Sequence, residues 1–250
     1  MRYLHTFSDH YKKGFENLLW RWPQHENHSR GGGRNRNGLL GALLEGINER
    51  TTMSGKAGQG RKFNIDDALE AATLVFWDSG YEGTSLAELT KAMGINPPSL
   101  YKAFGSKEDL FFSVVDHYNA THGSFMSVAF AEEETGLGLM RRLLIEAADH
   151  YPSKTFPGGC LVISSAVAVT SANRHVAERL SKMRNDNILA MADALTRDRD
   201  AGRIPQSTDT HAMAAFVGAT LQGMSQQARD GASKEDLLRI AHYAITAIGA

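Results

Sequence analysis

Cysteine, net charge and long hydrophobic runs are all scarce in this sequence of 250 residues. Its one cysteine, Cys160, cannot form a disulfide within the chain; we expect a small buried side chain or, as the alternative, a redox-sensing thiol. The formal net charge is −1. Because the chain as a whole is not a polycation, any contact with nucleic acid must come from a local basic surface.

Several membrane and enzyme classes are excluded by what is missing. The apolar run at residues 38–47 is too short to cross a bilayer and contains Glu45, and no secretory signal is recognisable, so we expect a cytoplasmic protein without a membrane partner. There is no Gly-x-Ser-x-Gly elbow, phosphate-binding loop or His-Glu-x-x-His zinc helix. His25 and His28 could share a helical face, but no further metal ligand lies nearby. The sequence therefore predicts a protein that is not an enzyme and needs no cofactor or metal.

Residues 1–60 differ in composition from the rest of the chain. Residues 29–38 and 54–60 are rich in glycine and can bury little apolar surface, so we expect a flexible N-terminal extension. Two interpretations of it are open. It is a poorly ordered leader, with Met53 as an alternative start, or a basic arm whose arginines at positions 30, 34 and 36 reach a DNA groove.

From residue 64 onward the pattern is helical. Apolar residues recur at steps of three and four in a first helix, which Asn64 can cap and Gly80 can end. A second helix begins at Ser85, where Glu88 completes a capping box, and it ends at Gly94. The signals predict two helices in close succession.

A third helix follows the second after only three residues. Asn96 can cap it, and Pro97 suits its first position because the missing N–H has no partner there. We expect Leu100 and Ala103 to face inward. A long fourth helix begins directly after Gly105. Two short helices joined so tightly must cross, as in the helix-turn-helix unit.

The third helix is the expected DNA-reading element, since its N-terminal residues can enter a major groove about 12 Å wide. Its exposed candidates offer donors, acceptors or apolar surface suited to bases and phosphates: Pro97, Pro98, Ser99, Tyr101 and Lys102. Thr84, Ser85 and Lys107, at the starts of the second and fourth helices, are expected to bind phosphates. The alternative is a helical adaptor without DNA binding, in which the third helix would be buried.

The sequence of residues 80–111 closely resembles the DNA-binding head of TetR-family regulators. The similarity includes Gly-Thr-Ser at 83–85, Ala-Met-Gly at 92–94, Ser-Leu-Tyr-x-x-Phe at 99–104 and Ser-Lys-Glu-x-Leu at 106–110, all in register. The resemblance implies an all-helical homodimer that binds a palindromic DNA operator, usually as a repressor released by a small-molecule effector. The long N-terminal extension departs from the family pattern.

Matched by position, the resemblance assigns a role to each expected DNA contact. It implies that Thr84, Ser85, Tyr101 and Lys107 contact phosphates, and that Pro97, Pro98, Ser99 and Lys102 face the bases. The whole chain then divides into the extension at 1–60, a three-helix helix-turn-helix DNA-binding domain at 61–110 and a larger helical ligand-binding and dimerisation domain at 111–250.

The remainder of the chain is predicted to be helical, with short breaks at 151–159 and 202–208. Residues 161–170 are apolar on nearly every side, which predicts a central buried helix. The last two helices, at about 210–228 and 234–248, carry small residues that permit close packing. In the family such a pair forms the dimer's four-helix bundle, so interface or core candidates are Phe216, Val217, Leu221, Met224, Leu237 and Tyr243.

A ligand pocket is harder to place from sequence. Aromatic, methionine and histidine side chains could line a mostly apolar cavity with a few polar anchors. The candidates are Phe125, Phe130, His150, Met183, Met191 and His211. For each of them ordinary core packing is the alternative.

Overall fold

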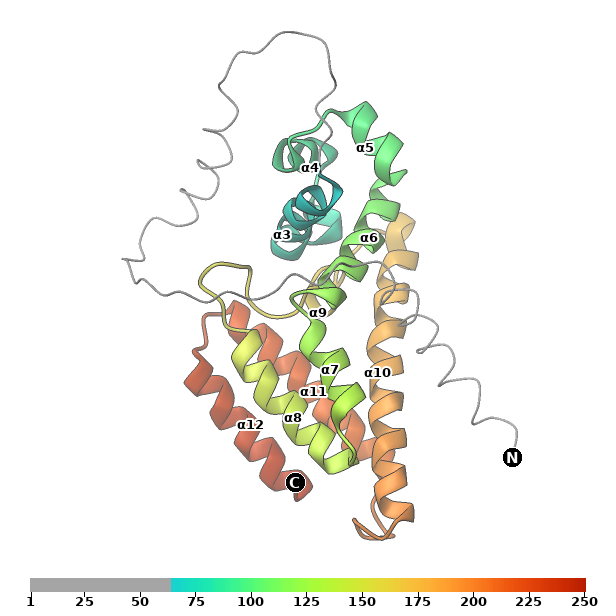
Figure 1. Cartoon of the computed structure of the whole chain (residues 1–250), viewed down its shortest axis with the longest axis vertical. Coiled ribbons are helices and arrows are strands. Elements are labelled where there is room, and N and C mark those ends of the chain that lie inside the picture. Colours follow the sequence, from blue (N-terminus) through green and yellow to red (C-terminus); the bar gives the residue numbers. More distant parts are fainter. Residues whose placement is uncertain (1–63) are drawn as a thin grey trace, which may run out of the picture. The chain divides into compact units, whose positions relative to one another are not determined.

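The computed structural model describes residues 64–250, and every regular element in that range is helical (Figure 1). The expected extension at 1–60 lies outside the described residues. The elements are α3 (Ile65–Gly83), α4 (Leu86–Met93), α5 (Pro97–Phe104), α6 (Lys107–Ala120), α7 (Ser124–Glu132), α8 (Gly136–His150), α9 (Leu161–Ser164), the 3-10 turn η1 (Ser171–Asn173), α10 (Arg174–Asp200), α11 (Thr210–Arg229) and α12 (Lys234–Ile248). The predicted all-α class is confirmed.

Local capping explains where the first helices begin and end. The Asn64 side chain accepts the Asp66 amide at 3.0 Å, and Gly80, with φ of +73°, interrupts α3 before a last turn to Gly83. At α4 the capping box is complete, because the Glu88 carboxylate accepts the Ser85 amide at 2.7 Å while the Ser85 hydroxyl accepts the Glu88 amide at 3.2 Å. These short-range bonds satisfy N–H groups that have no partner inside the helix.

An aromatic cluster joins α3 to α6. The rings of Phe76 and Tyr81 each meet the ring of Phe111 edge-on, with centroids 5.0 Å apart in both cases. Further along, Trp77 meets Tyr118 at 4.9 Å. All five side chains are buried. Packing of this kind fixes the angle between α3 and α6 and so supports the two short helices between them.

In the C-terminal part of the described chain, after α6, helix α8 packs against α10, α11 and α12 (Figure 1). Its inner face is fully buried at Met140, Leu143 and Leu144. The start of α8 is tied to the end of α10 by the buried Asp198 carboxylate, which accepts the Leu137 amide at 2.9 Å. Among residues 64–250 no helix is long and apolar enough to cross a membrane.

The buried helix expected at residues 161–170 is wrong in its extent. Helix α9 ends at Ser164, and Val167 is 75% exposed in the loop that follows. Three of the last four residues of the segment are β-branched, which lowers helix propensity. In addition, the Ser165 carbonyl accepts the Tyr81 amide of α3 at 2.6 Å. A contact with another element therefore replaces a helical bond here.

Candidate nucleic-acid interface

The turn between α4 and α5 has the tight geometry that the sequence predicts. Gly94 adopts a left-handed conformation with φ of +64°, and the Ile95 amide donates to the Thr90 carbonyl at 3.1 Å. The Asn96 side chain then accepts the Ser99 amide at 2.9 Å and starts α5. Only glycine adopts the left-handed conformation without strain, so this position allows the chain to turn in three residues.

One side of helix α5 packs against the core, and the opposite side is exposed to solvent. Leu100 is the only side chain of α5 that is fully buried. The expected inward position of Ala103 is wrong, because Ala103 is exposed and the neighbouring Phe104 is half-buried in its place. The Phe104 ring packs against the hydrophobic core, where it covers more apolar surface than a methyl group would.

The expected base-facing residues lie on the free side of α5. Pro97, Pro98 and Lys102 are exposed, Tyr101 is 50% exposed, and Ser99 is half-buried. A helix that shows a phenol, an ammonium group and proline rings over its first turns offers phosphate donors next to apolar surface for a thymine methyl.

The expected phosphate-binding positions lie beside α5, at the starts of α4 and α6. Ser85 is exposed, but Thr84 is buried and its hydroxyl donates to the Gly80 carbonyl at 2.7 Å. Of this pair only the Ser85 side chain is exposed, and its hydroxyl donates to the Glu88 carboxylate at 2.7 Å within the capping box. Burial lowers the pKa of Lys107, an effect that Glu82 and Glu88 oppose.

The sequence analysis did not identify two residues that contribute to this surface, Tyr81 and Lys91. The ring of Tyr81 lies 4.5 Å below the Lys107 ammonium and fixes its position by a cation–π contact. Lys91 adds an exposed positive charge at the end of α4. No periodicity or cap pairs Tyr81 with Lys107, and Lys91 follows the ordinary preference for a basic last turn.

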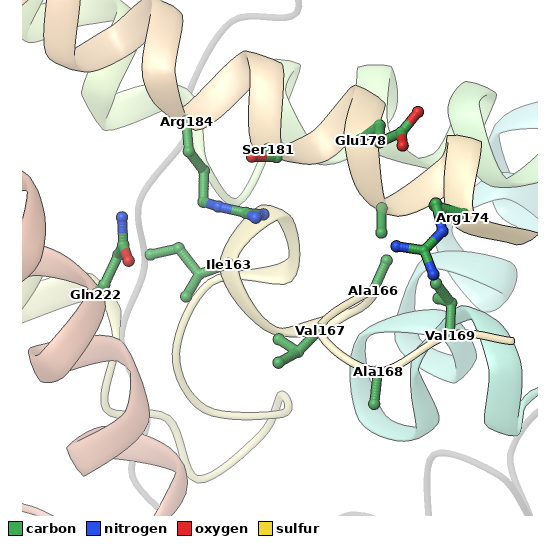
Figure 2. Close-up of a pocket in the computed structure, with 11 residues that line it drawn as sticks. Ile163, Ala166, Val167, Ala168, Val169, Arg174, Glu178, Ser181, Arg184 and Gln222 are labelled. Carbon is green, nitrogen blue, oxygen red and sulfur yellow. The ribbon is translucent and has the colours of Figure 1, made fainter. Parts of the chain in front are cut away.

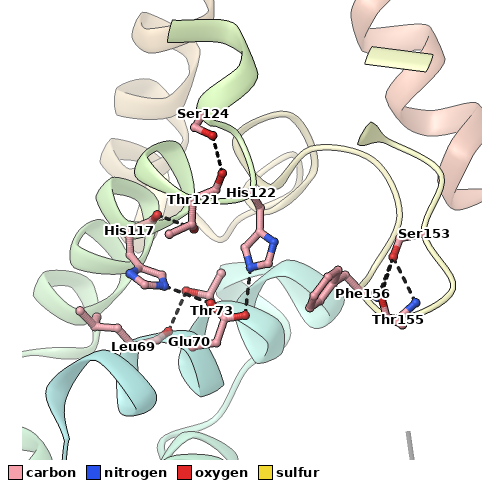
Figure 3. A network of polar contacts seen from close by, with 10 residues as sticks. All are labelled: Leu69, Glu70, Thr73, His117, Thr121, His122, Ser124, Ser153, Thr155 and Phe156. Atoms are coloured by element: carbon pink, nitrogen blue, oxygen red, sulfur yellow. Dashed lines mark hydrogen bonds and ion pairs between the residues drawn. The ribbon is translucent and has the colours of Figure 1, made fainter. Parts of the chain in front are cut away.

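A histidine–carboxylate network holds α3 against α6 and the turn before α7 (Figure 3). The Glu70 carboxylate contacts His117 Nε2 at 3.0 Å through one oxygen and His122 Nε2 at 2.9 Å through the other. These hydrogen bonds lower the pKa of Glu70 from 4.5 to about 2. The network therefore ties α3 to α6 and to the turn that contains His122. Within residues 64–250 no cluster of three His, Cys, Asp or Glu side chains is arranged to hold a metal ion.

The six residues expected to line a ligand pocket differ widely in their burial. Met191 and Phe125 are buried, Phe130 and Met183 are half-buried against the core, and His150 and His211 are exposed. The His150 ring stacks on Phe125 with centroids 4.8 Å apart. That these six residues bind a ligand stays a prediction.

A cavity of about 530 Å³ opens instead beside α10 (Figure 2). Its walls are α9 with the loop at 166–169, one face of α10 and Gln222 of α11. None of the six expected residues lines it. The sequence predicted a helix at 161–170, whereas the 166–169 loop that forms one wall of the cavity follows the shorter helix α9.

The expected interface candidates on α11 and α12 divide into two groups. Val217, Leu221, Met224 and Leu237 are buried in the chain's own core. Phe216 is 45% exposed and Tyr243 is 82% exposed. Only the second group is available to a partner.

Comparisons with known proteins agree with this architecture. Residues 68–114 match the family profile described as bacterial regulatory proteins, tetR family, and residues 136–243 match the tetracyclin repressor-like C-terminal domain. The HTH-type transcriptional repressor ComR of Escherichia coli is 33% identical over 185 residues, which are 74% of this chain and 88% of that protein. The HTH-type transcriptional repressor BdcR of the same species is 31% identical over 191 residues, or 76% and 92% of the two chains.

A solved structure shows the same likeness in three dimensions. A cysteine mutant of the TetR family transcriptional regulator CifR, in complex with a 26-bp double-strand operator DNA, superposes with a TM-score of 0.71. It is 38% identical, and the match covers 76% of this chain and 99% of that one. With the crossed helices α4 and α5, both family profiles and relatives above 30% identity, the chain belongs to the TetR family of bacterial regulatory proteins.

Proposed function

We propose that this protein is a DNA-binding transcriptional repressor, which binds a palindromic operator as a homodimer and is released by a small-molecule effector. The observation that carries the proposal is α5, a helix anchored at Leu100 with its opposite face free. Similar proteins point the same way, since ComR and BdcR are named transcriptional repressors and CifR was solved on operator DNA.

The contacts proposed for DNA follow from exposure and chemistry. Tyr101 and Lys107 bind phosphate oxygens, which orients the protein but carries no sequence information. Pro97, Pro98 and Lys102 reach the base edges, with Ser99 beside them. Ser85 and the backbone of Thr84 bind a further phosphate at the start of α4.

The proposed domain organisation is a helix-turn-helix head at 61–110, of which the structure describes residues 64–110, and a ligand-binding and dimerisation body at 111–250. Helix α6 is continuous across this boundary, so the two parts share an element. That continuity gives the body a direct mechanical connection to the DNA-binding head.

The homodimer is proposed to form through the outer faces of α11 and α12. On α11, Phe216, Ala219 and Gly223 are exposed at steps of three and four, and a Cβ added at Gly223 would meet no atom within 4 Å. On α12, Tyr243 is almost fully exposed. Pairing two copies would cover this apolar surface and form a four-helix bundle.

The alternative of an adaptor without DNA binding requires α5 to be covered. The exposure of Tyr101 and Lys102 disfavours it. An enzyme is not proposed, because the family comprises transcriptional regulators.

The first test is binding of the purified protein to its own upstream intergenic DNA at about 50 mM and about 200 mM salt. Tyr101→Ala and Lys107→Ala should lose specific binding. Lys154→Ala, an exposed lysine outside the helix-turn-helix unit, is the matched control and should retain it. Failure to select any specific site, even from genomic fragments, would favour the adaptor.

A further inference from the structure

The cavity beside α10 combines apolar walls with two guanidinium groups (Figure 2). Ile163, Ala166, Val167 and Val169 form its apolar side, and Arg174 and Arg184 stand on one face of α10. A volume of about 530 Å³ is in the range of pockets that hold small organic ligands. The site could therefore hold a molecule with a charged end and an apolar end.

The two arginines have unused donor capacity. A guanidinium group carries five N–H donors. Arg184 donates from Nη1 to the Val162 carbonyl at 2.8 Å, and within the described chain Arg174 forms no ion pair. Among the described residues that line the cavity Glu178 is the one carboxylate, and Figure 2 shows it pointing away from the 166–169 loop. The positive charge facing the cavity therefore lacks a neutralising partner there, which favours an anion.

The apolar part of a ligand also has a defined place. Val167 is 75% exposed, although the preceding Ala166 is buried. A hydrocarbon group lying against Val167 and Val169 would remove this apolar surface from water, at about 25 cal/mol for each Å² covered. A carboxylate joined to a short hydrocarbon tail satisfies both sides of the cavity.

The segment that forms the cavity also holds the DNA-binding head. The Ser165 carbonyl accepts the Tyr81 amide at 2.6 Å, Asn173 Nδ2 donates to Glu82 Oε2 at 2.8 Å, and His175 contacts Glu108 at 2.8 Å. Each of these three residues is a direct sequence neighbour of a residue that lines the cavity. Among the residues that the structure describes, the buried Ser165 hydroxyl has no hydrogen-bond partner, so the polar groups of this junction are not all satisfied.

We propose that this cavity binds small carboxylate anions with a hydrocarbon tail, which contact Arg174 and Arg184 and shift the 165–175 segment that positions the head. Binding there lowers the affinity for operator DNA. This inference rests on the proposed repressor function and specifies its effector class.

The test uses the full-length protein and a panel of probes, namely butanoate, hexanoate, octanoate and benzoate, each compared with its uncharged amide. Direct binding is measured by calorimetry without DNA, and operator affinity is measured with and without each probe. We expect at least one carboxylate to bind at least about tenfold more tightly than its amide, because charge-assisted bonds to arginine are lost in the amide. The same carboxylate should weaken operator binding.

Variants separate this site from other surfaces. Arg174→Gln should weaken carboxylate binding about tenfold while leaving operator binding without a probe unchanged. Val167→Asp, at an exposed position where folding is not at risk, should abolish carboxylate binding by repulsion. Arg141→Gln, an exposed arginine on α8 outside the cavity, should bind like the natural protein.

Four results would overturn the inference. The first is that no panel member binds at up to about 10 mM, a concentration at which even weak sites fill. The second is that a carboxylate and its amide bind equally, and the third is that Arg174→Gln binds the carboxylate as tightly as the natural protein does. The fourth is that a carboxylate binds without affecting operator affinity. Operator binding in the absence of probes reports separately on the repressor function, so the two failures are distinguishable.

Discussion

Substitution of Leu100 by alanine tests whether α5 depends on one buried anchor. Leu100 is fully buried, and no other side chain of α5 is. Removing a buried leucine side chain in this way costs about 2–5 kcal/mol, because transfer energy is lost and a cavity remains. A loss of about 3 kcal/mol lowers the Tm of a chain of this size by about 6–12 °C.

The consequence for DNA binding is larger than for an equally destabilising change elsewhere. Without its anchor, α5 spends much of its time detached, and the apparent Kd rises in inverse proportion to the docked fraction. We expect operator affinity to fall about tenfold or more at a temperature where the protein is still folded. Fluorescence anisotropy with labelled operator, together with a thermal melt, measures both effects.

The matched control is Leu144→Ala on α8, where another fully buried leucine is removed from the body. It should lower the Tm by a similar amount and leave operator affinity within about threefold of the natural protein. Equal operator affinity in the two variants, or an unchanged Tm for Leu100→Ala, would refute the idea that this anchor positions the reading helix.

Three further predictions concern the body and the Glu70 network. Gly159→Ala should destabilise the protein strongly, because φ is +77° and the new Cβ would lie 2.5 Å from the Ser225 carbonyl oxygen. Gly202→Ala is the control: φ is +72° but no atom lies within 4 Å of the new Cβ, so the free energy of unfolding should fall by only about 1–2 kcal/mol in a urea titration. Equal losses of stability in the two variants would contradict this prediction. Cys160 is buried, which raises the pKa of its thiol, so we expect reaction with a thiol reagent at neutral pH only after urea unfolding, whereas rapid labelling of the folded protein would show an accessible thiol. For Glu70 the folded pKa of about 2 lies below the ordinary 4.5, so its stabilisation is present above about pH 4.5 and is lost as the pH falls toward 2. The stability difference between the natural protein and Glu70→Gln should therefore shrink between pH 7 and pH 3, and a constant difference would argue against a stabilising role of this network.

Short-range signals predicted most of the helix boundaries. Helix caps depend only on nearby residues, since a capping side chain bonds to an amide two or three positions away. The caps that the sequence showed are Ser85 with Glu88, Asn96 with Pro97, and Gly94. The helix-turn-helix unit could be predicted from these positions because its geometry depends on turn length and caps. The same is true of α12, whose predicted range of 234–248 agrees with the observed helix.

Only the tertiary structure decided the features that depend on contacts between distant segments. The loop at 165–170 replaces an expected helix because the Ser165 carbonyl bonds to Tyr81, far away in sequence. Tyr81 also makes the cation–π contact with Lys107. The cavity beside Arg174 exists because that loop, α10 and α11 meet. The sequence by itself determined the helices and the reading head, since caps and periodicity are local. Their mutual packing determined the cavity and the junction, because such contacts leave no periodic trace in the sequence.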